Sequence, residues 1–296
     1  MSSLSVPSLS VSSVDQATDS ALCRSISVGA SPEFNAIWDA LMCSDPGAKI
    51  SRLRSIAWPI KSQAARAVLP IPVPGHPPRP LLVAPRALKS RGLGSAHGRA
   101  ALVHAVAHIE FNAINLALDA MYRFRDLPAD YYSDWYSVAL DEARHFELLS
   151  QRLQALGFSY GDFPAHNGLW EAACKTADSC LARMALVPRV LEARGLDVTP
   201  GMIERLERAG DQPTVAILQV ILSEEVAHVT IGTRWFRYCC AQQGLDPDAT
   251  FLELVRAHSA SAIRRPFNEA ARRVAGFTDD EQTALAVMAD SMAQTR

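Results

Sequence analysis

The chain has 296 residues, 49% of them hydrophobic, and a net charge of −2. Its length allows one large domain, or a core domain with appended segments, and no uninterrupted apolar run approaches the roughly 18 residues of a membrane-spanning helix. The six cysteines show no CxxC spacing, which argues against a zinc ribbon or a disulfide framework and favours reduced thiols in the cytoplasm.

The N-terminal third of the chain is predicted to hold little regular structure. Residues 1–30 are rich in serine and lack the basic and apolar segments of a secretory signal, so they are predicted to be a disordered tail. Short helices are predicted at 31–43 and 46–66. From 67 to 98 the chain has too much proline and glycine for regular structure, and we expect an extended arm that wraps across a larger body.

Positive charge is concentrated in residues 46–109, which contain ten Lys and Arg and no Asp or Glu. The rest of the chain therefore carries 19 basic residues against 31 acidic ones. Two interpretations stay open. The basic segment either contacts an anionic partner or neutralises the acidic body of its own chain.

Long helices are predicted from residue 99 onward, because apolar residues recur at three- and four-residue spacing. The third of them should end at Gly195, which follows Arg194 in a common C-terminal pairing of cation and glycine. The predicted long helices span 99–127, 129–156, 168–194 and 213–243.

Shorter helices complete the prediction. One is expected at 201–210, and two or three lie in the last fifty residues, one of them with a capping box of Thr278 and Glu281. No alternating strand pattern competes, so the predicted fold class is all-α. We expect a four-helix bundle at 99–243, preceded by short helices and a wrapping arm at 31–98 and followed by packed C-terminal helices at 244–296.

Two of the long helices repeat one polar motif inside an apolar run. The segment VALDEARHFELL carries Glu142 and His145, and the segment VILSEEVAHVTI carries Glu225 and His228. Residues three apart lie on one helix face, so each pair can bind one metal ion. Burying an ionised carboxylate without a partner costs several kcal/mol, and metal cations would supply such partners.

Each motif has a glutamate about one helix upstream. Glu110 precedes Glu142 by 32 residues, and Glu192 precedes Glu225 by 33. In an antiparallel helix pair that turns near residue 127, Glu110 and Glu142 lie nearly equally far from the turn and meet at one level.

The second pairing fits less well, because Glu192 lies near the predicted end of its helix. Residues 196–211 must then continue in the direction of the third helix before the chain returns. Glu171 and Asp178 remain alternative ligands on the third helix.

One Glu on each of two helices, with Glu-x-x-His on each of two others, is the ligand set of ferritin-like di-metal bundles. Carboxylate oxygens with one imidazole per metal suit iron or manganese. The alternative is a polar core without metal.

The segments HIE (108–110), EARHF (142–146) and LEARGLD (191–197) are similar to helices of the tRNA hydroxylases that act on isopentenyl-adenosine. Over the bundle and the preceding arm, the chain resembles more closely a bacterial family of ferritin-like proteins of unknown function. The match around LEARGLD favours Glu192 over its alternatives. The metal ligands that the resemblance implies are Glu110, Glu142, His145, Glu192, Glu225 and His228.

In a di-iron site of this kind, Glu142 and Glu225 are the candidates for bridging the two ions. Asp141 and Glu224 each precede a bridging candidate and point about 100° away from it. They either accept a proton from the histidine of the opposite motif or pair with an arginine, such as Arg144 or Arg183. His104 and His108 lie on a different face from Glu110 and are expected to pack rather than bind metal.

These features predict an O₂-dependent di-iron oxidoreductase, of the hydroxylase or oxygenase type, with two iron ions or with Mn/Fe or Mn and an external electron donor. The expected substrate is a small molecule or a nucleoside. A tRNA nucleoside is a candidate, with tRNA contacting residues 46–109. The alternative is a ferritin-like protein that oxidises or handles iron without an organic substrate. A monomer or dimer is expected, because the arm would be awkward in a storage shell.

Overall fold

The structure is a computed structural model that describes residues 31–60, 68, 70–89 and 91–294. Within these ranges every regular element is helical, and the one β contact is an isolated bridge between Leu82 and Ala165. The predicted all-α class is therefore confirmed. The predicted disordered tail at 1–30 lies outside the described residues.

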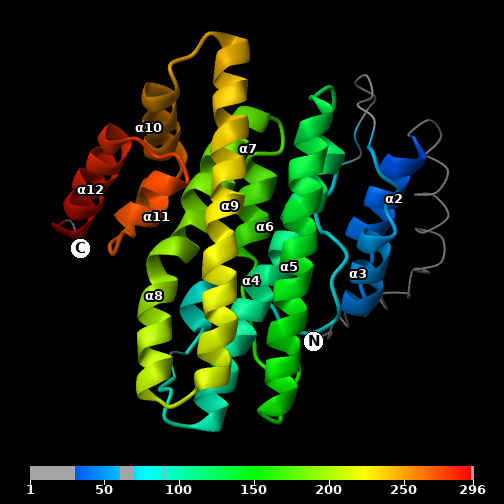
Figure 1. Ribbon diagram of the computed structural model, residues 1–296, viewed down its shortest axis with the longest axis vertical. Helices are drawn as coiled ribbons and strands as arrows, with labels where there is room; N and C mark the ends of the chain where they lie inside the picture. The colour runs from blue at the N-terminus through cyan, green and yellow to red at the C-terminus, as the bar shows by residue number, and fades with distance from the viewer. Residues whose placement is uncertain (1–30, 61–67, 69, 90, 295–296) are drawn as a thin grey trace, which may run out of the picture.

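Four long helical segments pack against one another at the centre of the molecule (Figure 1). Helix α4 packs along α5, α5 packs on α9, and α9 packs on a segment formed by α7, the π-helical turn η2 and α8. The N-caps of α4 and α9 are the side chains of Ser95 and Asp211, and left-handed Gly244 ends α9. The bounds are α4 Ala96–Arg123, α5 Ala129–Ala155, α7 Cys180–Leu186, η2 Val187–Glu192, α8 Ala193–Arg208 and α9 Gln212–Gln243.

The prediction of one helix over 168–194 is right at its start but wrong in two respects, because the helix is interrupted after Lys175 and does not end at 194. Helix α6 (Gly168–Lys175) stops before a turn, and α7 starts again where the side chain of Ser179 accepts from the Ala182 N–H. Buried Arg183 holds this turn closed, because its Nε donates to Thr176 Oγ1 at 2.7 Å. At the other end, α8 does not stop at Gly195 but runs to Arg208, and it includes the short helix predicted at 201–210.

Contacts from the C-terminal segment keep α8 helical past Gly195 and Pro200. Pro200 has no N–H and cannot donate to the carbonyl of Leu196, four residues earlier. That carbonyl accepts instead from Asn268 Nδ2 at 3.2 Å. The next residue, Asp197, is buried in an ion pair with Arg272 at 2.7 Å. The chain therefore continues in the direction of the third helix, as a ligand role for Glu192 requires.

The π-helical turn η2 lies in the middle of this segment. Its Ala193 N–H donates to the carbonyl of Pro188, five residues earlier. Pro188 itself cannot donate to the preceding turn, which favours a local widening of the helix. Glu192 is the last residue of this turn.

The N-terminal segment covers one side of the central helices. Helices α2 (Pro32–Leu41) and α3 (Pro46–Arg54) pack on α4 and α5, and α3 ends well before the predicted residue 66. The arm that follows has one short helix, η1 (Pro85–Ala87). Backbone atoms hold the arm in place: Trp170 Nε1 donates to Pro72 O, and the Val83 N–H donates to Ala165 O.

The C-terminal segment packs on the other side, against α7 and α9 (Figure 1). The predicted capping box is present, since the Glu281 N–H donates to Thr278 Oγ1 at 3.1 Å and the Thr278 N–H donates to Glu281 Oε2 at 3.0 Å. The elements are α10 Pro247–His258, η3 Ala260–Ala262, α11 Glu269–Val274 and α12 Asp279–Gln294.

Two of the described helices, α4 and α9, are long and apolar enough by composition to cross a membrane, although neither holds an uninterrupted apolar run of that length. In α4, 78% of the apolar window is buried inside the protein, against 39% in α9. Both helices carry buried carboxylates, Glu110 and Glu225. This apolar character is thus weak evidence for a membrane span.

Candidate metal centre

The structure brings residues of both motifs together in one buried cluster. Glu110 of α4, Glu142 and His145 of α5, and Glu225 of α9 each offer a ligand atom, and these atoms all lie within 4.8 Å of one another. His228 of α9 adjoins them, with its Nδ1 atom 3.0 Å from Glu142 Oε1 and 3.6 Å from Glu225 Oε1. All five residues are buried.

Glu192, the sixth predicted ligand, lies near this cluster at the end of the π-helical turn. Its Oε2 atom is enclosed and has no hydrogen-bond partner in the described part of the chain. Burial, and next the charges of Glu225 and Glu142, raise the pKa of Glu192 to about 8. The alternatives Glu171 and Asp178 are exposed, so the structure separates them from the cluster.

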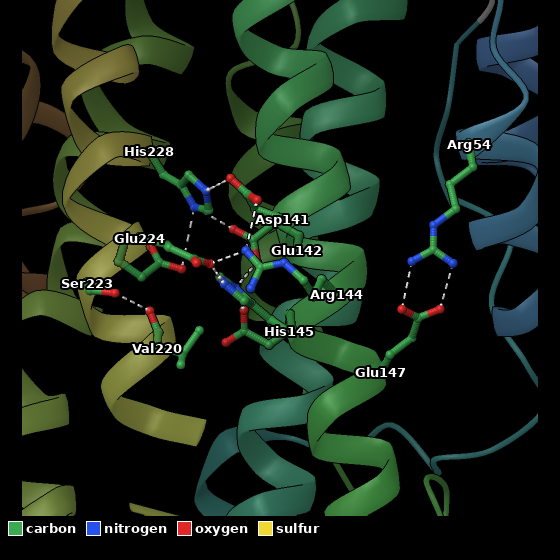
Figure 2. Close-up of polar contacts among 12 residues, drawn as sticks. Arg54, Asp141, Glu142, Arg144, His145, Glu147, Val220, Ser223, Glu224 and His228 are labelled. Carbon is green, nitrogen blue, oxygen red and sulfur yellow. Dashed lines mark hydrogen bonds and ion pairs between the residues drawn. The ribbon is translucent and has the colours of Figure 1, made fainter. Parts of the chain in front are cut away.

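The two histidines are held in matching orientations (Figure 2). Each turns Nδ1 toward the cluster and Nε2 toward an acid of the opposite motif. His145 Nε2 lies 2.6 Å from Glu224 Oε2, and His228 Nε2 lies 3.4 Å from Asp141 Oδ2. A carboxylate at Nε2 fixes the ring orientation and leaves Nδ1 as the atom that can bind a metal.

Arg144 joins these two outer acids. It donates to Asp141 Oδ1 at 3.0 Å and also to Glu224. Both interpretations of Asp141 and Glu224 therefore apply, because each acid contacts a histidine and also pairs with an arginine. The suggestion of Arg183 as a partner is wrong, because Arg183 is buried in an ion pair with Asp119 at 2.6 Å.

Charge is unevenly shared among the buried groups. Burial, and next the charge of Glu142, raise the pKa of both Glu110 and Glu225. For Glu142, burial acts in the same direction, but contacts with His145 and His228 outweigh it and lower the pKa. For His145, burial is outweighed by Glu110 and Glu142, which raise the pKa to about 11. These pKa shifts favour bound protons where cations would otherwise balance the carboxylates.

Several buried atoms of these residues form no hydrogen bond. Among the residues that the structure describes, Glu142 Oε2, Glu192 Oε2 and His228 Nδ1 have no hydrogen-bond partner. The 3.0 Å contact between His228 Nδ1 and Glu142 Oε1 also lacks hydrogen-bonding geometry. Unpaired lone pairs that converge in a buried space are expected of metal ligands, because burial without partners is otherwise costly. The residues of the cluster therefore fit a metal ion.

His104 and His108 serve a separate polar network on α4. His104 Nε2 accepts from the Gly161 N–H at 2.9 Å, and His108 Nδ1 lies 2.9 Å from the Tyr160 hydroxyl. Burial lowers the pKa of both histidines to about 4. They hold the connection between α5 and α6 in place as neutral rings. Packing was expected of both histidines, but the contact with Tyr160 was not.

The chain belongs to a family described as "Protein of unknown function (DUF455)", whose model matches residues 42–283. An uncharacterized protein of Haemophilus influenzae is 45% identical over 216 residues, which cover 71% of this chain and 75% of that protein. No solved structure matches the chain. The region that the family model matches includes all six predicted metal ligands.

Proposed function

We propose that the central helices form a ferritin-like bundle that binds two iron ions, and that the protein is an O₂-dependent oxidoreductase of the hydroxylase type. The observation that supports the proposal most directly is the buried cluster of Glu110, Glu142, His145 and Glu225, with His228 in contact. Its residues come from the helices and motif positions typical of such bundles.

The positions of the carboxylates suggest how they would share two ions. Glu142 lies between the histidines, with one oxygen 3.5 Å from His145 Nδ1 and the other 3.0 Å from His228 Nδ1. This placement favours Glu142 as a bridging ligand. Glu110 is 3.2 Å from His145 Nδ1, which favours a terminal role on the same side. Glu225 and Glu192 would complete the other side.

The residues around these ligands hold them in position. Two adjacent ferrous ions would supply electrons to O₂. Asp141 and Glu224 hold the histidine rings by their Nε2 atoms, and Arg144 pairs with both acids and keeps them in place. Phe146 and Val138, one helical turn on either side of Glu142, are buried apolar neighbours of this carboxylate on the same face of α5.

Metal analysis of purified protein is the first test. We expect two iron ions per chain, and an oxo-bridged di-iron absorption band after the ferrous protein is exposed to air. Glu142→Gln should reduce the stoichiometry, whereas Glu171→Gln, at an exposed glutamate of α6, should not. A chain that binds fewer than two metal ions, or a Glu142→Gln variant that binds them normally, would contradict the proposal.

Substrate oxidation is tested separately. Small metabolites and modified nucleosides, tRNA nucleosides among them, are incubated with the ferrous protein, a reductant and isotopically labelled O₂. A hydroxylase incorporates one labelled oxygen atom into its product. If iron binds and is oxidised but no compound gains oxygen, the protein handles iron without an organic substrate. In that case a mass near a monomer or dimer argues against a storage shell.

A further inference from the structure

A cleft with a cavity volume of about 200 Å³ lies between the arm, the start of α4 and the end of α8. Its apolar floor includes Leu102 and Ala105 of α4 together with Phe163. Its rim carries Lys89 and Arg91 of the arm and Arg205 of α8. No Asp or Glu is among the described residues that line it.

Among the residues that the structure describes, no carboxylate pairs with the three cations on the rim. No ion pair to Lys89, Arg91 or Arg205 is formed within the described part of the chain, although Arg91 lies over the Phe163 ring at 5.5 Å from its centroid. By contrast, Arg54 and Arg99 of the same basic region pair with Glu147 and Asp211. The basic region therefore neutralises its own chain only in part.

The backbone adds to the positive potential of the cleft. Gly98, in the first turn of α4, lines the cavity. The N-terminal end of a helix carries partial positive charge, and α4 is 28 residues long. Three cations that form no ion pair with the described residues, together with a helix N-terminus and an apolar floor, favour an anionic group attached to an apolar body.

A partly exposed apolar face of α4 runs along the helix from this cleft to the level of the metal centre. Leu102, Ala105 and Ile109 lie on one face by their spacing, and Ile109 is 48% exposed. Ile109 directly precedes the candidate ligand Glu110. At 1.5 Å per residue, the level of Glu110 is about 12 Å along the helix from Leu102.

We propose that this cleft binds the phosphate group of a small phosphorylated compound whose apolar part lies along the exposed face of α4. Arg91 and Arg205 hold the phosphate from two sides, and Leu102, Ala105 and Ile109 contact the apolar part. That this compound is the molecule oxidised at the metal centre rests on the proposed function. Binding in the cleft does not.

Calorimetric titration of metal-free protein with n-octyl phosphate tests the cleft without the metal centre. We expect Arg91→Gln and Arg205→Gln each to weaken binding about tenfold, the loss of one charge-assisted contact. Ala105→Glu, which places a negative charge on the exposed floor, should abolish binding. Arg86→Gln is the matched control, because Arg86 belongs to the same arm but does not line the cleft, and it should bind as the wild type does.

Three further ligands identify which part of the compound is recognised. Inorganic phosphate and n-octanol should each bind more weakly than n-octyl phosphate, because each lacks half of the interaction. Single-stranded RNA that binds with equal loss from Arg86→Gln and Arg91→Gln would show a diffuse basic surface and overturn the proposal. So would n-octyl phosphate affinity that neither Arg91→Gln nor Arg205→Gln changes. If the cleft binds its ligand but the protein holds no iron, only the proposed function fails.

Discussion

Replacing Glu192 with Gln should stabilise the metal-free protein and weaken its binding of metal. The pKa of Glu192 is raised from 4.5 to about 8, mainly by burial and then by Glu225 and Glu142. A group whose pKa is raised by folding contributes stability that is complete below its ordinary pKa. That stability is lost as the pH rises toward 8.

The magnitude follows from the size of the shift. Each pH unit between the two pKa values is worth about 1.4 kcal/mol, so by pH 7 Glu192 has lost on the order of 3 kcal/mol of stability. Gln cannot ionise and avoids this loss. The variant should therefore unfold with a free energy up to about 3 kcal/mol larger than the wild type at pH 7, and with nearly the same value at pH 4.5.

Urea denaturation of chelator-treated protein between pH 4.5 and 8 measures this difference. Added Fe²⁺ or Mn²⁺ should stabilise the wild type by about 2.7 kcal/mol at a hundredfold excess over the dissociation constant, and the variant by less at the same concentration. Glu171→Gln, at an exposed position on α6, is the control and should change neither quantity. The reasoning is refuted if Glu192→Gln lowers the stability of the metal-free protein at pH 7. It is also refuted if added metal stabilises Glu192→Gln and Glu171→Gln by the same free energy.

Three further predictions concern the supports of the site. Asp141→Asn and Glu224→Gln should each lower metal affinity about 10- to 100-fold in a chelator competition, because these two acids orient the histidines. The control Glu147→Gln, at a residue of α5 that pairs with Arg54, should not change metal affinity. Gly232→Ala should cost about 1–3 kcal/mol in thermal unfolding, because its new Cβ would lie 2.4 Å from Pro188 Cβ. Gly195→Ala meets nothing within 4 Å and should not destabilise. Arg183→Met should cost about 3–5 kcal/mol by leaving buried Asp119 short of a partner, and Asp119→Leu added to it should recover part of that loss.

Local patterns were sufficient to predict the first half of the cluster. Both α4 and α5 are regular helices, and Pro128 marks the turn between them. Glu110 and Glu142 lie nearly equally far from that turn, one on each helix, so they meet at one level. The opposite placement of Asp141 and Glu224 also followed from helix geometry, because a residue one position away points about 100° aside.

The second half depends on contacts that no local pattern contains. The break before α7 depends on Arg183, whose ion-pair partner Asp119 is 64 residues away. The continuation of α8 past Pro200 depends on Asn268, which is 72 residues from Leu196. A glycine after a cation is a reasonable signal for a helix end, but tertiary packing overrides such preferences. The helix boundaries on both sides of Glu192, at the break before α7 and at the end of α8, were therefore predicted wrongly.

The π-helical turn shows why spacing alone could not position Glu192. One extra residue in a helical turn rotates everything after it by about 100° relative to a regular α-helix. The π-helical turn comes close to α9 at Gly232, which lies one helical turn beyond His228. A side chain at Gly232 would collide with Pro188. The absence of a side chain at Gly232 and the presence of Pro188 thus set the distance between the helices that carry Glu192 and His228. A chain with the same Glu–33–Glu-x-x-His spacing but a larger residue at the position of Gly232 should not bring its upstream glutamate to the cluster in the same way.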